Sequence, residues 1–336
     1  MELSFPEDFR CPISLEVMSD PVILTSGHTF DRPSIQRWLD SGNLTCPVTN
    51  LPLPRHPSLI PNHALRRLIS QFAPPHPTYL RSCHSPLSFP SDAETLTDLL
   101  CKIRSSSPDL RRSIADSQTP SVLFRHVSSR CGDHHHLRKL AAYCLLYLSL
   151  DDDDVKVGLV AEGIVDHLIA AVESKSDGSA AAATVITSLS TVDVNKCVIG
   201  AHPSAIPALA AMLIEERSSK REKKEAATAI YELAKFPENR RRVVRTGAVK
   251  ELARMAGSGL DRAVEVLALL AKTKEGRAEM GRIEGFVRVL VRIVRSGSRR
   301  GAESAAAALE LLSHEDGEIG AAAELVVNSG LAKVSS

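Results

Sequence analysis

Three side chains near the start of the chain, Cys11, His28 and Cys46, belong to the types that bind zinc or act as nucleophiles. A structural zinc site needs four nitrogen or sulfur ligands, usually supplied as closely spaced pairs. Here Ser14 and Thr49 stand three residues after the two cysteines, where the second ligand of each pair belongs, and a hydroxyl is a poor zinc ligand. We therefore expect neither a metal nor another cofactor, and we expect both cysteines to be small buried core residues.

A cysteine nucleophile activated by His28 is the second chemistry that these residues could support. A cysteine and a histidine without a third, orienting group are a weak signal for catalysis. His28 follows Gly27 in a segment that is typical of a turn. A structural role for the cysteines is therefore favoured over a nucleophilic one.

The composition narrows the classes of protein. The 336 residues include 41 Lys and Arg against 40 Asp and Glu, so no net charge draws the chain to nucleic acid or membrane. Aromatic residues make up only 4%, which is typical of packed helices. The seven cysteines are scattered and follow no secretory signal, so we expect a cytoplasmic location, with the nucleus as an additional one. Apolar runs fall short of the ~20 residues that a membrane span needs.

The elements that must position Cys11, His28 and Cys46 lie in residues 1–73. Short apolar runs, turn signals and two helix-like segments predict a small α+β unit there. Asp31 is the expected N-cap of the first helix, and Gly42 its stop. Residues 74–94 hold five prolines and predict a linker. We expect this unit to have an apolar core, formed by Ile13, Val22, Ile23, Phe30, Ile35, Leu39, Leu59, Leu65 and Leu68.

Residues 95–336 are self-similar. A small residue followed by an apolar one opens a helix at residues 163, 205, 247, 285 and 330, a spacing of roughly 40 residues that is typical of two- or three-helix solenoid repeats. Alanine-rich helices lie between, so each repeat is expected to supply two long helices and to bury its apolar face against its neighbours. The period and the helix starts resemble armadillo repeats, with a degenerate first portion up to about residue 136.

Several spaced motifs agree in the first unit: Cys11-Pro12-Ile13, Asp20-Pro21-Val22, Gly27-His28-Thr29-Phe30-Asp31, Trp38-Leu39, Cys46-Pro47 with Thr49, and Ile60-Pro61-Asn62. Together they resemble the U-box, the zinc-free relative of the RING domain. The resemblance implies a RING-like fold in which hydrogen bonds and ion pairs replace zinc. The candidates for these bonds are Ser14, Glu16, Asp31, Arg32, Thr49 and Asn62.

The resemblance also implies an activity. A U-box docks an E2 enzyme that carries ubiquitin as a thioester, and a substrate lysine attacks the thioester directly, without a covalent ubiquitin intermediate on this chain. The rate then comes from proximity and orientation. The positions that match the E2-binding groove of the family are Ile13, Trp38 and Pro47. Asn50 matches the polar residue that orients ubiquitin, although it is shorter than the Arg or Gln common there.

The repeats carry no catalytic constellation, so binding of a protein substrate is their expected role. Residues 212–302 hold 22 Lys and Arg against 12 Asp and Glu. Arg288, Arg292 and Arg295 form one stripe on a predicted helix. If this is the third, groove-lining helix of its repeat, the groove would favour acidic or phosphorylated substrates; a solvated face is the alternative. The basic segment 218–227 is expected to be an inter-repeat loop that runs into a helix.

Both modules together resemble the plant U-box proteins with armadillo repeats, which implies an E3 ubiquitin ligase. The alternative function is a non-catalytic armadillo scaffold whose U-box-like segment binds partners without promoting transfer.

Overall fold

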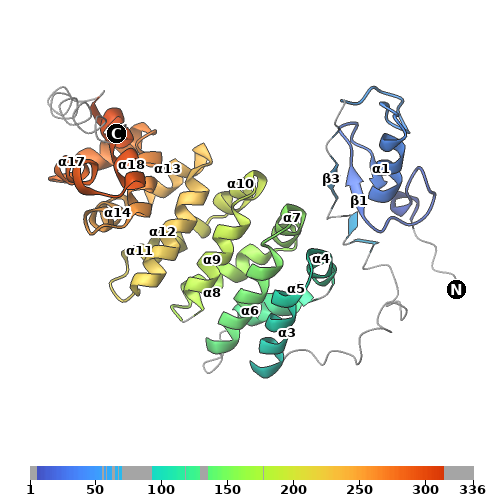
Figure 1. Cartoon of the computed structure of the whole chain (residues 1–336), viewed down its shortest axis with the longest axis horizontal. Coiled ribbons are helices and arrows are strands. Elements are labelled where there is room, and N and C mark those ends of the chain that lie inside the picture. Colours follow the sequence, from blue (N-terminus) through green and yellow to red (C-terminus); the bar gives the residue numbers. More distant parts are fainter. Residues whose placement is uncertain are drawn as a thin grey trace. The chain divides into compact units, whose positions relative to one another are not determined.

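The computed structural model describes residues 6–54, 57, 59–62, 65–66, 68–69, 93–117, 119–128, 135–176 and 178–313. The chain divides into two compact units, Met1–Ser88 and Phe89–Ser336 (Figure 1). The predicted linker, residues 74–94, lies outside the described residues except for its last two, which begin a helix. The predicted fold class, a small α+β unit followed by an all-α solenoid, is confirmed.

The N-terminal unit is built around a small antiparallel sheet in the order β2-β1-β3. Its strands are β1 (Pro21–Ile23), β2 (Thr29–Asp31) and β3 (Ile60–Pro61). Val22 lies opposite Phe30, so that two large apolar side chains pair across the hairpin. Gly27 has φ +80°, the left-handed conformation that a tight turn requires. A 3-10 helix, η1 (Glu7–Phe9), precedes the sheet, and α1 (Arg32–Asp40) follows β2 directly.

The core of this unit matches the expected one with two shifts. Val22, Phe30 and Ile35 are fully buried, as predicted. The prediction that Leu68 lies in the core was wrong: its side chain is 47% exposed, and the next residue, Ile69, is buried instead. Residue 23 is only half-buried, and its neighbour Leu24 lies in the core. In both cases the apolar run was found correctly and the residue that faces the core was misplaced by one.

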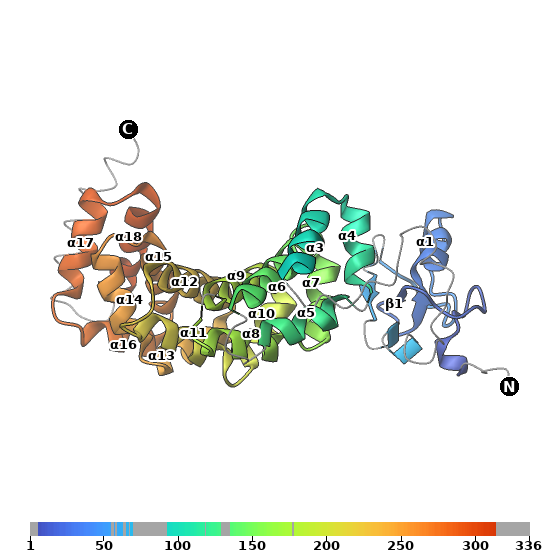
Figure 2. The same cartoon turned by 90° about the horizontal axis from the view of Figure 1, so that it is seen from below.

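The second unit is a stack of three-helix repeats whose helices form three rows (Figure 2). The first row is α4 (Pro108–Ala115), α7 (Asp153–Ala161), α10 (Asp193–Ala201), α13 (Pro237–Arg245) and α16 (Lys274–Gly281). The second row is α5 (Thr119–Ser128), α8 (Ile164–Glu173), α11 (Ala205–Ile214), α14 (Ala248–Gly257) and α17 (Phe286–Ser296). The third row is α3 (Ala93–Ser105), α6 (His135–Leu148), α9 (Ser179–Leu189), α12 (Lys220–Ala234), α15 (Asp261–Leu270) and α18 (Arg299–Ser313).

The repeat is richer than the sequence predicted. Two long helices were expected in each repeat, and the structure adds the short first-row helix. The degenerate N-terminal portion forms a complete triplet, α4 to α6, with α3 packed on α6 as a cap. The predicted helix starts open the second-row helices: Gly163, Gly247 and Gly285 all have positive φ directly before them. The start at residue 330 lies outside the described residues.

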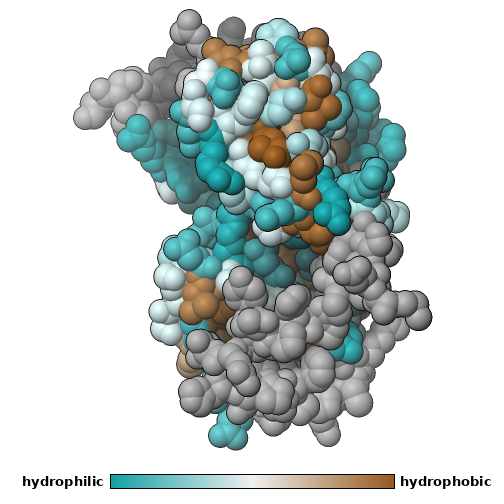
Figure 3. Space-filling model, turned by 90° about the vertical axis from the view of Figure 1, so that its right-hand side faces the viewer, coloured by the Kyte–Doolittle hydropathy of each residue, from teal (hydrophilic) through white to brown (hydrophobic). Residues whose placement is uncertain are grey.

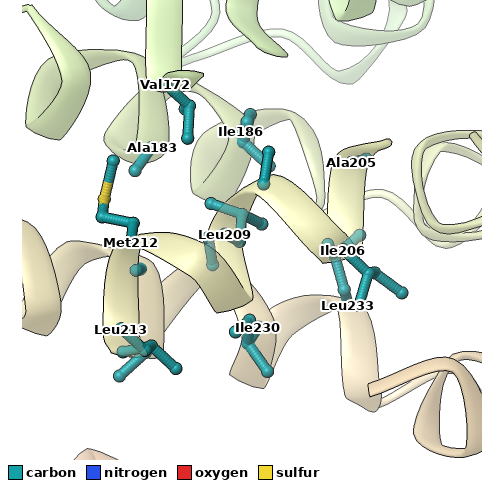
Figure 4. Close-up of a cluster of buried hydrophobic side chains, with 14 of the residues drawn as sticks. Val172, Ala183, Ile186, Ala205, Ile206, Leu209, Met212, Leu213, Ile230 and Leu233 are labelled. Carbon is teal, nitrogen blue, oxygen red and sulfur yellow. The ribbon is translucent and has the colours of Figure 1, made fainter. Parts of the chain in front are cut away.

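Apolar side chains from all three rows fill one continuous core. Figure 4 shows part of it, where Leu209 of α11 lies between Ile186 of α9 and Ile230 of α12, and Met212 points toward Ala183. Alanines are fully buried in α9, α12 and α15, which lets the third-row helices pack closely on one another. A repeat therefore gains its stability from its neighbours.

Two buried asparagines fasten successive repeats. The Asn239 side-chain amide donates to the carbonyls of Lys196 and Leu233, both at 2.9 Å. Asn195 makes the same pair of bonds one repeat earlier, to Lys156 and Leu189, at 3.1 and 3.0 Å. Each asparagine thus satisfies a carbonyl at the end of a third-row helix and one in the preceding first-row helix.

Among the described residues, no single helix has the length and apolar composition to cross a membrane. Only α10 and α11 taken together, with a bend of 79° between them, meet those criteria.

Candidate functional site

Two loops of the N-terminal unit, Cys11–Glu16 and Cys46–Leu51, have the same backbone fold. In each, the cysteine N–H donates to the carbonyl five residues later, at 2.8 and 2.9 Å. The cysteine carbonyl accepts from the N–H four residues later, at 2.8 and 2.9 Å. That fourth residue, Leu15 or Asn50, has a positive φ of 60° or 55°. We call these two segments the twin loops.

The sulfur of Cys11 is the centre of the first twin loop. The side chain is fully buried, and the Asp31 N–H donates to its Sγ at 3.3 Å. Burial raises the pKa of Cys11, but donors from Asp31, Ser14 and Ile13 together outweigh it and leave the pKa below its ordinary value. The sulfur thus receives hydrogen bonds from several sides, much as a metal-bound thiolate does.

Cys46 occupies the same place in the second twin loop. Its sulfur is fully buried and accepts a hydrogen bond from the Ser26 hydroxyl at 3.1 Å. Burial acts to raise the pKa of Cys46, but the Ser26 and Thr49 hydroxyls and the N–H groups of Thr49 and Val48 lower it to about 7. Both cysteines are therefore fastened to the β1–β2 hairpin, one through Asp31 and the other through Ser26.

A polar network joins the first twin loop to the rest of the unit. The Asp20 carboxylate forms an ion pair with Arg32, at 2.8 Å, and a second one with Arg66. Asp31 stands at the N-cap of α1, as predicted, but its carboxylate does not cap the helix. It accepts instead from the N–H groups of Ser19, at 2.9 Å, and Asp20, at 2.7 Å. The side chain thereby holds the turn that leads into β1.

Asn62 extends this network to the C-terminal part of the unit. Its amide nitrogen donates to the Thr29 hydroxyl at 3.2 Å, and its carbonyl oxygen accepts from the Leu65 N–H at 3.1 Å. The Asn62 backbone N–H donates to Pro21, at 2.7 Å, so the residue connects both strands of the hairpin to the following segment. Besides lowering the pKa of the two cysteines, the Ser14 and Thr49 hydroxyls accept long bonds of 3.4 Å from backbone N–H groups in their own loops.

Sequence reasoning missed three members of this network: Asp20, Arg66 and Ser26. The Asp-Pro dipeptide before β1 was a turn signal, and an aspartate there is well placed to meet an arginine. Arg66 had no local signal, because its partner lies 46 residues away. Among the described residues, no cluster of three or more His, Cys, Asp or Glu side chains could hold a metal ion. His28 Nδ1 lies 3.2 Å from the Ser26 carbonyl oxygen, within the turn.

The predicted E2-facing residues lie at the edge of this network. Ile13, in the first twin loop, and Pro47, in the second, are half-buried. Trp38 of α1 is half-buried too, and its indole N–H donates to the Thr45 carbonyl at 2.9 Å, which fixes the ring beside the second loop. Asn50 is exposed, and its carboxamide makes no hydrogen bond to another described residue.

Both twin loops carry exposed apolar side chains. Leu15 is 70% exposed, Leu51 58% and Val48 45%. Figure 3 shows the molecule from the side of the N-terminal unit, and apolar residues lie between hydrophilic ones on that face. Large apolar side chains held out to solvent on ordered loops are typical of a protein-binding surface.

The predicted basic stripe lies elsewhere than expected. Arg288, Arg292 and Arg295 are exposed on α17, as predicted, and Arg292 donates to the Gly257 carbonyl at 2.9 Å. However, α17 is a second-row helix, and α18 is the third helix of this repeat. The stripe therefore lies on the second helix of its repeat and not on the third, as the prediction required. The short first-row helix α16 adds one helix before it. The segment 218–227 runs from an inter-repeat loop into a helix, as predicted: Ser219 and Glu222 form a capping box, and α12 begins at Lys220.

The chain is similar to known proteins over nearly all of its length. Residues 5–77 match the U-box domain family, and residues 79–334 match the plant U-box protein ARM repeat region. U-box domain-containing protein 8 of Arabidopsis thaliana is 46% identical, over 95% of this chain and 89% of that protein. U-box domain-containing protein 9 of the same plant is 33% identical, over 94% and 74%.

Solved structures support the fold of the second unit. A designed armadillo repeat protein superposes with a TM-score of 0.57 at 18% identity, over 66% of this chain and 92% of its own. Another designed armadillo repeat protein, solved in complex with the peptide (KR)4, has a TM-score of 0.56 at 18% identity, over 65% and 92%. At this identity the likeness concerns the fold alone.

Proposed function

This chain belongs to the plant U-box proteins that carry an ARM repeat region, and from that premise we propose that it is an E3 ubiquitin ligase. U-box proteins are generally ligases of this class. The U-box docks an E2 that carries ubiquitin as a thioester, and a lysine of a substrate held by the repeats attacks that thioester. No covalent ubiquitin intermediate forms on the chain, so catalysis consists of proximity and orientation.

The twin loops carry this proposal. They expose three aliphatic side chains, Leu15, Val48 and Leu51, and hold Ile13 and Pro47 half-buried beside them. The loops are fixed by paired backbone hydrogen bonds, so the E2 meets a surface that is already ordered. A pre-ordered apolar surface loses little entropy on binding, which favours a specific though modest affinity.

Trp38 is the expected anchor of the E2 contact. A large rigid ring beside smaller apolar residues is typical of an interface hot spot. Its hydrogen bond to Thr45 ties the ring to the residue directly before Cys46, so ring and loop are positioned together. Loss of the ring therefore removes a contact and loosens the loop.

Asn50 is proposed to orient the bound ubiquitin. Its φ of 55° suits asparagine, which adopts the left-handed region more readily than most residues. The exposed carboxamide offers both a donor and an acceptor to the E2 and to ubiquitin. Its short reach implies a smaller bias toward the reactive conformation than a longer side chain would give.

The proposal is tested by autoubiquitination with a panel of E2 enzymes and by E2 binding of the full chain. Ile13→Ala and Leu15→Ala should reduce both binding and product formation. Ile60→Ala is the matched control: Ile60 is a 54% exposed aliphatic residue on β3, outside the twin loops. Equal behaviour of all three variants, with folding intact, would remove the twin loops from the interface.

The scaffold alternative has a distinct signature. A chain that binds an E2 through the twin loops and yields no ubiquitin product with any E2 is a scaffold. Asn50→Arg then separates a weak activator from an inactive one, because a longer, charged donor should raise product formation only where the E2 already docks productively.

A further inference from the structure

A hollow of about 410 Å³ lies between α13 and the turn that joins α15 to α16. We call it the α13 hollow. Its lining includes one carboxylate, Glu238, against five cationic side chains: Arg240, Arg241, Arg242, Arg245 and Lys272. It belongs to the first and third rows of the solenoid and is separate from the stripe on α17 and from the twin loops.

Most of this positive charge is not neutralised within the molecule. Arg245 and Lys272 are exposed and have no ion-pair or hydrogen-bond partner among the described residues. Arg242 donates to a neutral group, the Asn239 side-chain oxygen, at 2.7 Å. Arg241 alone meets a carboxylate, Glu275, at 3.3 Å, and both members of that pair are exposed. An incoming anion therefore meets cations that have little competing charge nearby.

Two of the arginines are held in place by the repeat itself. Arg240 donates to the carbonyls of Ala234, at 2.9 Å, and Lys235, at 3.1 Å, at the end of α12. Burial lowers the pKa of Arg240 below its ordinary value, and the charge of the Glu238 carboxylate opposes this shift only in part. Arg242 donates a hydrogen bond to the side-chain oxygen of Asn239, whose amide nitrogen in turn donates to two backbone carbonyls. Arg240 and Arg242 are thus half-buried and held by hydrogen bonds, while Arg245 and Lys272 are exposed and available to a ligand.

A second, apolar hollow opens directly beside the first. Its volume is about 580 Å³, and it shares Arg242 and Arg245 with the α13 hollow. Half of the remaining wall comes from α11 and is aliphatic: Ile206, Pro207, Ala210, Ala211 and Ile214. The end of α10, the turn after it with His202 and Pro203, and Thr246 complete the wall. Ile214 is 46% exposed, although it belongs to a helix whose other large side chains are mostly buried. Anionic and aliphatic binding are therefore adjacent on one surface.

We propose that these two hollows together bind a phosphorylated segment of a partner protein, with the phosphate in the α13 hollow and a neighbouring aliphatic side chain in the apolar one. A phosphate carries up to two negative charges and three acceptor oxygens, and it satisfies several guanidinium groups at once. A single carboxylate leaves most of the five cations unpaired. Neither hollow is lined by Phe, Tyr or Trp, the large rings on which nucleic-acid bases would stack, and His202 is the one ring in the lining of the apolar hollow.

This site goes beyond ubiquitin transfer, because the bound partner need not be a substrate. It also differs from the predicted α17 stripe, because none of the three stripe arginines lines either hollow. The test below measures binding alone, so an inactive U-box leaves its result unchanged.

The test uses the full chain and an oriented peptide library with a fixed central phosphoserine, together with the same library built on serine. The phosphorylated library should bind preferentially and select an aliphatic residue at a fixed offset. A single selected peptide, followed by fluorescence anisotropy, should lose at least about tenfold in affinity to the Arg245→Glu/Lys272→Glu variant. Glu238→Gln should tighten binding, because it removes the one carboxylate of the lining.

The matched control is Arg288→Glu/Arg295→Glu, which makes the same change of net charge on α17. It should bind the peptide as the unaltered chain does. Three results overturn the proposal: equal binding of the serine and phosphoserine libraries, an equal loss in the α17 control, or tighter binding of single-stranded RNA that the same hollow variant abolishes. Circular dichroism checks that each variant is folded.

Discussion

In the U-box, a few polar side chains join short elements, whereas in the solenoid each helix buries apolar side chains against the next repeat. Asp20, Asp31 and Asn62 connect segments that lie far apart in the sequence, and all three are only half-buried. The solenoid core is continuous from α3 to α18, and its polar side chains act mainly as fasteners between repeats. The U-box therefore depends on specific partners, and the solenoid on summed burial.

Two buried cysteines, one in each unit, show the same difference between polar and apolar surroundings. Cys46 and Cys144 both have fully buried side chains. Burial raises the pKa of Cys144 to about 12, while hydrogen-bond donors bring that of Cys46 down to about 7 despite its burial. A core that offers only apolar contacts opposes charge, and the U-box interior, which offers donors, accepts it.

The largest effect is expected where burial dominates. Leu209→Ala in α11 should lower the free energy of unfolding of the solenoid by about 3–4 kcal/mol, because it leaves a cavity in the packed core. The midpoint of denaturation followed by circular dichroism at 222 nm should move to lower denaturant concentration. The midpoint followed by fluorescence of Trp38, the only tryptophan of the chain and located in the U-box, should not move. A shift of both signals by the same amount would show that the two units unfold as one.

The converse change is Asp20→Ala. Removal of this half-buried carboxylate leaves Arg32 and Arg66 without their shared partner and should destabilise the U-box by about 2–3 kcal/mol. The Trp38 transition should move while the helical signal at 222 nm stays. Glu279→Ala, which removes an exposed ion pair with Arg282 in the solenoid, is the matched control and should change stability by less than about 0.5 kcal/mol. A similar effect of both variants would contradict the special role of Asp20.

A smaller effect is expected from a fastener of the solenoid. Asn239→Ala removes the two hydrogen bonds that its amide donates to the carbonyls of Lys196 and Leu233 and the one that it accepts from Arg242, at a cost of about 2 kcal/mol. Hydrogen exchange should speed up in α10 and α13 and remain unchanged in the U-box. If exchange is unaltered in both helices, the fasteners do not hold the repeats together.

The smallest effect is a pH dependence confined to the U-box. Because the pKa of Cys46 falls from 9.0 to about 7 on folding, the unfolded chain binds more protons between these values. The free energy of unfolding should therefore rise by roughly 1–2 kcal/mol from pH 7 to pH 9 and be lost again as the pH falls through 7. Cys46→Ser should remove most of this rise in the Trp38 transition and leave the smaller share that comes from the lowered pKa of Cys11, and Cys144→Ser should preserve the rise. An unchanged rise in Cys46→Ser would assign it to another group.

The fold followed from the sequence because its signals are local and repeated. The apolar periodicity and the glycines that precede the second-row helices recur in most repeats, so the solenoid and its period were predicted. The short first-row helices were missed because they lack a long apolar stripe. The twin-loop positions were visible as paired Cys-Pro motifs. The hydrogen bonds and ion pairs of the network were not visible, because Asp31 bonds to Ser19, and Arg66 to Asp20, over sequence separations that no local pattern reveals.

The same dependence on non-local structure explains why the helix row of the α17 arginines was predicted incorrectly. Exposure of Arg288, Arg292 and Arg295 was readable from their spacing, but their row depended on the number of helices in a repeat. The α13 hollow combines α13 with Lys272, which is 35 or fewer residues away in the sequence and lies in the turn between α15 and α16. Such a site exists only after the helices of the solenoid have packed together.

The most direct test of the central claim is single-turnover discharge of ubiquitin from a loaded E2 to free lysine, with the full chain present and a metal chelator added. The chain should accelerate discharge at least about tenfold, with the chelator without effect, because hydrogen bonds order the twin loops. Ile13→Ala should remove this acceleration and Ile60→Ala should leave it. Discharge at the rate of the E2 alone with every E2 that binds the chain, or acceleration that the chelator abolishes, would contradict the account.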